Sequence, residues 1–112
     1  MIIKTEEYNI NCSDPNKVNI KGSMRLPSPL SYENLFEPIK NHIENATDQY
    51  VINIENLDYL NSSGLTALAR ILILGRSLKK PIKILANNNI PWQKKSLLSL
   101  EKLWDKIEVK FI

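Results

Sequence analysis

One stretch near the middle of the chain restricts the possible folds more than any other. A short β-branched segment, 50–54, is followed by a polar segment, 55–60, and then by a long apolar segment. A short apolar run bounded by polar residues is typical of a parallel strand covered on both faces. Leu65, Leu68 and Leu72 then recur at helical spacing. The stretch therefore predicts a buried strand, a polar loop and a helix.

Three residues that often cap helices stand where this helix should begin, namely Asn61, Ser62 and Ser63. Their short side-chain oxygens can accept hydrogen bonds from the first unpaired N–H groups of a helix. Those N–H groups and the positive end of the helix dipole also favour a phosphate. Two interpretations stay open at this point. The serines serve only as caps, or one of them is phosphorylated and changes the sign of the surrounding surface.

The segment Leu60-Asn61-Ser62-Ser63-Gly64-Leu65, following an apolar strand, resembles the Asp-Ser-Ser/Thr-Gly-Leu signature of STAS domains. The likeness is greatest to bacterial anti-sigma-factor antagonists of partner-switching systems. In that family a partner kinase phosphorylates the serine after the Asp, which implies Ser62 here, with Ser63 as the alternative. Asn61 stands where the family usually has Asp. The cap is kept, but one negative charge is lost.

The resemblance implies a non-enzymatic regulator without a cofactor. When unphosphorylated, it would bind a serine-kinase anti-sigma factor or a related histidine-kinase-like ATPase. Phosphorylation would release it, and a metal-dependent serine phosphatase would reset it, as part of transcription regulation. The implied partner-binding residues are Asp58, Asn61, Ser63, Gly64, Thr66, Arg70 and Ile73.

Ile73 is an apolar residue on the predicted outward stripe of the helix, which also contains Thr66, Arg70 and Ser77. An exposed apolar residue beside an arginine suits a docking surface. A rotated stripe, with Ile73 against the rim of the core, would explain the same spacing.

Two other function classes compete with the switch. A passive scaffold or ligand-sensing STAS module would bind a protein or a small anion without modification. A hydrolase using Ser62 or Ser63 is disfavoured, because the chain lacks a Gly-x-Ser-x-Gly elbow. His42, the single histidine, has no partner set for a metal or a triad and is expected at the surface. A phosphate in the intact mass of the cellular protein would single out the switch.

Length and composition predict one soluble domain over residues 1–112, with its core at about 8–111. The first seven residues lack the apolar region of a signal peptide, and no run is long enough to cross a membrane. We therefore expect a cytoplasmic protein without membrane contact. The net charge of +3 is modest and its lysines are dispersed. We interpret these lysines mainly as solvated surface, with an anionic protein partner as the next interpretation and nucleic acid after it. A monomer or weak dimer is expected, and the single Cys12 excludes an intramolecular disulfide.

The remaining elements follow from turn formers and periodicity. Strands 8–12 and 17–24 should form a hairpin around the turn formers of 13–16. Two prolines make 25–30 a rigid loop, and a short turn over 32–36 should precede a helix over 37–45. In that helix Pro38 would take a first-turn position.

After the central helix, expected from about Ser63 to Lys79, we predict a strand at 81–86, a helix at 91–99 and a strand at 106–111. The fold class is thus α/β of the STAS type. It has a mixed, mostly parallel sheet of about five strands with helices packed on it, in the order β-β-α-β-α-β-α-β. Loops after parallel strands emerge on one edge of a sheet. The 55–62 and 87–90 loops should therefore share the binding surface.

Overall fold

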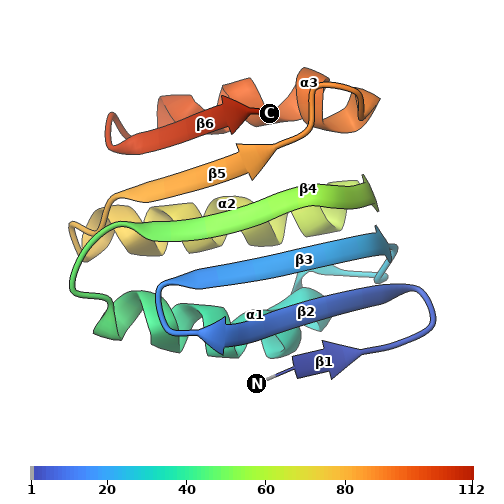
Figure 1. The fold of residues 1–112 in the computed structure, drawn as a ribbon, viewed down its shortest axis with the longest axis horizontal. Coiled ribbons are helices and arrows are strands. Elements are labelled where there is room, and N and C mark those ends of the chain that lie inside the picture. The colour runs from blue at the N-terminus through green and yellow to red at the C-terminus, as the bar shows by residue number, and fades with distance from the viewer. Residues whose placement is uncertain (1) are drawn as a thin grey trace.

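A computed structural model describes residues 2–112, and Met1 lies outside the described part of the expected domain. Within it the elements are β1 (Ile2–Lys4), β2 (Tyr8–Asp14), β3 (Lys17–Met24), α1 (Pro29–Asn45), β4 (Tyr50–Leu60), α2 (Ser62–Ser77), β5 (Ile82–Ala86), α3 (Pro91–Leu100), a 3-10 turn η1 (Glu101–Leu103) and β6 (Ile107–Phe111). The strands form one six-stranded sheet in chain order, β1-β2-β3-β4-β5-β6 (Figure 1). None of the helices of residues 2–112 is long and apolar enough to cross a membrane.

The helices lie on one face of the sheet (Figure 1). Strands β3 to β6 are parallel, and a helix connects each of them to the next. Right-handed crossovers between strands added in one direction place every connecting helix on the same side. In β4, Ile52 and Ile54 are buried while Val51 and Asn53 are only partly covered. The expectation of a strand covered on both faces is therefore wrong, and the second face of the sheet is open.

The α/β class and the mixed, mostly parallel sheet are confirmed, with one strand more than expected. The additional strand is β1, which pairs antiparallel with β2 through Ile3 and Ile10. At three residues, β1 is too short to show an alternation of polar and apolar residues. The predicted hairpin of β2 and β3 is confirmed. It depends on Gly22, which has φ +96 and whose added Cβ would lie 2.1 Å from the Glu7 carbonyl oxygen.

Helix α1 is continuous from Pro29 to Asn45, so the predicted turn and later helix start are wrong. Ser28 is the N-cap, and its side chain accepts a hydrogen bond from the Ser31 amide. Pro38 stands inside the helix, where it removes one backbone hydrogen bond and costs about 3 kcal/mol. Each large apolar side chain buried on the helix contributes about 1.5–3 kcal/mol. This burial outweighs the cost at Pro38, and the residues concerned are Tyr32, Phe36, Ile39 and Ile43.

Helix α2 has the predicted phase, although it spans Ser62–Ser77 and not 63–79. Leu68 and Leu72 are buried, whereas Thr66, Arg70 and Ser77 are exposed. Ile73 leaves 49% of its surface exposed, which fits the unrotated stripe.

The C-terminus of α2 adopts a left-handed turn at Lys79, where φ is 57. The Lys80 amide donates to the Gly75 carbonyl at 2.8 Å, and the Lys79 amide donates to Arg76 at 3.1 Å. This pattern closes a helix as a Schellman motif does, in which glycine is the usual left-handed residue.

Lys79→Gly is expected to raise the free energy of unfolding by about 0.5–1 kcal/mol. A left-handed conformation costs a residue with a Cβ roughly 1–2 kcal/mol, which exceeds the entropy that glycine adds to the unfolded chain. Urea denaturation measures the change. Ser77→Gly, two residues earlier at the last position of α2, is the control and should lower stability. An unchanged or lower midpoint for Lys79→Gly would contradict the reasoning.

Candidate functional site

The candidate site lies where β3 and β4 end and α2 begins. The β4 strand continues to Leu60, so the predicted polar loop over 55–60 is wrong. Its later half pairs with β3 as far as Met24, whereas its pairing with β5 ends at Asn53. Pairing on one side is enough to hold this polar segment extended. Ser62 therefore follows a fixed strand end, separated from it by Asn61 alone.

Asn61 is the N-cap of α2 and uses both ends of its carboxamide. Its Oδ1 accepts hydrogen bonds from the Gly64 amide at 3.0 Å and from the Tyr32 hydroxyl at 2.7 Å. Its Nδ2 donates to the Leu26 carbonyl at 2.8 Å. The amide orientation is determined, because a backbone N–H only donates and a carbonyl only accepts. Asn61 thus links α2 to α1 and to the loop after β3. We call this set of contacts the Asn61 clamp.

Tyr32 completes the Asn61 clamp from helix α1. Its buried hydroxyl accepts a hydrogen bond from the Leu26 amide at 3.2 Å and donates its own hydrogen to Asn61. Burial raises the pKa of the Tyr32 hydroxyl, an effect larger than the lowering by the Leu26 amide. The hydroxyl therefore stays protonated and keeps its role as a donor.

Ser62 is exposed at the first position of α2, whereas Ser63 is half-buried. Within residues 2–112 the Ser62 hydroxyl makes no hydrogen bond, and the Ser62 carbonyl accepts from the Thr66 hydroxyl at 3.1 Å. A Cβ on the buried Gly64 would lie 2.3 Å from the Leu60 side chain, so only glycine lets the helix begin this close to the strand. The Ser62 hydroxyl is consequently free for chemistry, while its neighbours hold the turn.

The other residues expected to bind a partner divide into two groups. Asp58, Thr66 and Ile73 are exposed. Arg70 is exposed as well, but its guanidinium pairs with Glu33 of α1 at 2.7 Å.

In the second group, Asn61 is half-buried and Gly64 is buried. Both can affect a partner only indirectly, because they fix the backbone that supports the exposed residues. Sequence reasoning missed a further pair beside the site. The Arg25 guanidinium lies 4.5 Å from the ring centroid of Tyr59, which is 39% exposed.

Sequence reasoning also missed the polar contacts that complete β4. Beyond Asn53 the β4 strand no longer pairs with β5, and on that side its carbonyls accept hydrogen bonds from side chains at the start of α3 and in the loop before it. Gln93, which is fully buried, donates through Nε2 to Ile54 at 2.7 Å and to Leu57 at 3.0 Å. Its Oε1 accepts from the Asn87 amide at 2.8 Å.

Two neighbours of Gln93 add to these contacts. The Asn87 side chain donates to the Glu55 carbonyl at 3.1 Å, and the Trp92 indole donates to Leu57 at 3.0 Å. The 55–62 and 87–90 segments, which were expected to lie at one edge of the sheet, are therefore joined by a hydrogen bond. One feature of the sequence could have predicted these contacts. Gln93 lies one helical turn before Leu97, on the inward face of the predicted helix, where a polar side chain needs buried hydrogen-bond partners.

His42 does not have the surface position that was expected for it. It is half-buried, its Nδ1 is buried, and its ring centroid lies 6.4 Å from that of Tyr50. It lies there because α1 packs on the sheet through the adjacent Ile43. Burial raises the pKa of the Tyr50 hydroxyl above its usual range. Residues 2–112 hold no group of three or more His, Cys, Asp or Glu side chains suited to a metal ion.

No protein-family model matches the chain, and no curated protein matches it. A solved structure does. It is the complex of the diguanylate cyclase SiaD with its activator SiaC from Pseudomonas aeruginosa, and the alignment covers 100% of this chain and 99% of the matched chain. The TM-score is 0.69 and the sequence identity 14%. The matched chain is SiaC, a STAS-like protein.

This chain has the STAS-type fold. The resemblance seen in the Leu60 to Leu65 segment is thereby confirmed at the level of the fold. Within the STAS-type fold, the segment forms the junction of the central strand and the following helix, which is where the Ser62 hydroxyl is exposed.

Proposed function

We propose that this protein is a non-enzymatic regulator whose binding to a partner is switched by phosphorylation of Ser62. The observation that carries the proposal is the division of roles at the start of α2. Asn61 caps the helix, and Ser62 is exposed, with a hydroxyl that makes no hydrogen bond within residues 2–112. A phosphoryl group can therefore be added to Ser62 without breaking the cap.

The physical effect of the phosphate differs between the free and the bound protein. In the free protein, about −1.5 to −2 charges at a helix N-terminus are favourable by roughly 0.3–1 kcal/mol per charge. In a complex the same charge must lose its water, and an acidic group opposite it would cost several kcal/mol. The fold would persist while the complex dissociates. The proposed contact residues are Asp58, Ser63, Thr66, Arg70 and Ile73, supported from below by Asn61 and Gly64.

The proposed partners are enzymes. SiaC is described as the activator of the diguanylate cyclase with which it forms a complex. That likeness supports a protein that regulates by binding to an enzyme. The resemblance to anti-sigma-factor antagonists supports a serine-kinase anti-sigma factor or a histidine-kinase-like ATPase as the partner that phosphorylates Ser62, and a metal-dependent serine phosphatase that removes the phosphate.

The test begins with co-purification of the partner from the native organism and uses four forms of this protein in a binding titration. The unmodified protein and Ser62→Ala are expected to bind alike, and Ser62→Ala should stay folded because it is not the cap. The phosphoprotein should bind at least about tenfold more weakly, since a desolvated dianion costs several kcal/mol. Ser62→Asp, with fewer charges and acceptors, should lie between them.

Ser63→Ala is the matched control, because it removes the neighbouring hydroxyl and leaves Ser62. It should still accept phosphate. Loss of phosphorylation in Ser63→Ala alone would move the site by one residue. Equal affinities of the unmodified protein, the phosphoprotein and Ser62→Asp would remove the switch and leave a passive scaffold.

A further inference from the structure

The open face of the sheet carries a row of amide side chains. Register places Asn11 of β2 opposite Asn19 of β3, and Asn19 opposite Asn53 of β4. Each of them alternates with buried residues along its strand, so the three side chains point away from the helices. We call these residues the amide row.

The amide row presents mainly hydrogen-bond donors. The Oδ1 of Asn11 accepts from the Ser13 amide at 2.9 Å, and the Oδ1 of Asn53 accepts from the Glu55 amide at 3.0 Å. Both oxygens are thus occupied by their own strands. The Nδ2 groups of Asn11 and Asn53 have no acceptor within residues 2–112, so they remain available to an outside group.

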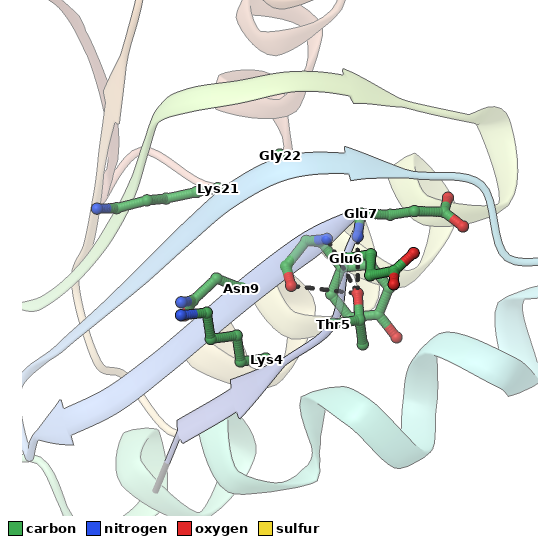
Figure 2. A pocket seen from close by; sticks show the side chains of 8 residues that line it. Lys4, Thr5, Glu6, Glu7, Asn9, Lys21 and Gly22 are labelled. Carbon is green, nitrogen blue, oxygen red and sulfur yellow. Dashed lines mark hydrogen bonds between the residues drawn. The ribbon is translucent and has the colours of Figure 1, made fainter.

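A second row, Lys4, Asn9 and Lys21, crosses β1, β2 and β3 on the same face. Figure 2 shows these three side chains extending in one direction from adjacent strands, while Glu6 and Glu7 point the other way. Neither lysine forms an ion pair with residues 2–112, and both are exposed. We call these residues the lysine row. It offers positive charge with no carboxylate of its own.

The charge of the whole open face is positive. The lysines of this face, with those of the lysine row included, outnumber its carboxylates, which come from Asp14 opposite Lys17, from Glu55, and from Glu108 at 3.9 Å from Lys83. The additional lysines are Lys17, Lys83 and Lys110. A surface of ammonium groups and amide donors is complementary to a ligand rich in negatively charged acceptors.

We propose that the open face binds an acidic segment of a partner protein. Carboxylates of that segment pair with the lysine row, and its carboxylate or backbone oxygens accept from the amide row. This surface lies on the sheet itself and needs no phosphate, so the inference goes beyond the switch at Ser62.

Two other anionic partners fit the face less well. Single-stranded nucleic acid is bound largely through aromatic side chains on which its bases stack. The two rows contain amides and lysines only. An anionic membrane would attract the lysines. It would make no directed use of an amide row in fixed register, which suits a polypeptide.

The probe is a fluorescein-labelled peptide of about a dozen residues in which glutamate alternates with threonine, long enough to cross the sheet at roughly 3.3 Å per residue. In NMR spectra, the side-chain amide signals of Asn9, Asn11, Asn19 and Asn53 are expected to shift when the peptide is added. Fluorescence anisotropy should show affinity that falls as salt rises. Peptide binding without movement of these amide signals would overturn the proposal.

Charge reversal locates the site. Lys4→Glu with Lys21→Glu should weaken peptide binding at least about tenfold, because two attractive contacts become repulsive. The matched control is Lys94→Glu with Lys95→Glu, which makes the same change in net charge at exposed positions on α3. It should alter affinity by less than about twofold. Equal weakening by the two pairs would mean attraction to net charge only and would overturn the proposal.

Two further arms keep the test decisive. If the protein with Lys4→Glu and Lys21→Glu fails to fold, Lys4→Gln with Lys21→Gln is expected to weaken binding about threefold, and no weakening would overturn the proposal. An oligouridylate or a phosphatidylserine vesicle that binds the open face more tightly than the peptide would overturn the acidic-protein assignment. Ser62→Asp should bind the peptide as the unmodified protein does, so the result is independent of the switch.

Discussion

Gln93→Met is expected to lower the free energy of unfolding by about 3 kcal/mol or more. The substitution keeps the length of the side chain but leaves the Ile54 carbonyl and the Asn87 amide without the partner that Gln93 provides. A buried polar group left unsatisfied costs about 1–3 kcal/mol. The loss is a large fraction of the roughly 5–15 kcal/mol that stabilises a small domain. Chemical denaturation measures it directly.

Two controls isolate the hydrogen bonds of Gln93. Lys95→Met places the same side chain at an exposed position of the same helix and should change stability by less than about 0.5 kcal/mol. Trp92→Phe removes the indole donor from the Leu57 carbonyl, but this carbonyl still accepts a hydrogen bond from Gln93. The free energy of unfolding is therefore expected to fall by only about 1 kcal/mol. If Gln93→Met were as harmless as Lys95→Met, the Gln93 hydrogen bonds would contribute nothing to stability.

Asn61→Asp is expected to destabilise the protein by about 1–2 kcal/mol at pH 7, although Asp is usual at this position of the STAS signature. The change replaces the Nδ2 donor by an oxygen that faces the Leu26 carbonyl, so a hydrogen bond becomes a contact between two acceptors. The interaction of a negative charge with the start of a helix stabilises the protein by only about 0.3–1 kcal/mol, which is less than this loss. Below about pH 4 the new carboxyl protonates and can donate again, so the deficit should shrink.

The control for this change is Asn88→Asp, which adds the same charge at an exposed turn position. Its side chain makes no hydrogen bond within residues 2–112, so stability should be nearly unchanged at both pH values. Thermal unfolding of the two variants at pH 7 and about pH 3 provides the comparison. A more stable Asn61→Asp at pH 7 would mean that the Asn61 clamp does not depend on the amide.

The parts of the fold that repeat a pattern could be predicted from the sequence. The spacing of Leu68 and Leu72 determines which face of α2 is buried, and the turn formers before Lys17 determine the hairpin. The extended later half of β4 could not be predicted. Its polar residues are held by pairing with β3 and by Gln93, and both depend on contacts distant in the sequence.

The candidate site could be placed but not described in detail. The Ser62 position followed from the motif, and Ser62 is exposed at the first position of α2, while its phosphorylation stays a prediction. The three contacts of Asn61, one of them with Leu26, bring together distant residues and leave no local pattern. The interior position of Pro38 has a similar cause, since local propensity opposes it and tertiary burial of α1 decides it.

The agreement between strand order and chain order has a consequence for how the molecule assembles. Each strand pairs with the strand that precedes it in the chain, so no strand has to enter between two that are already paired. The chain segment between two paired strands is therefore short, and the entropic cost of bringing its ends together is small. The sheet can therefore grow by one strand and one helix at a time from the N-terminal hairpin, in the order in which a ribosome releases the chain.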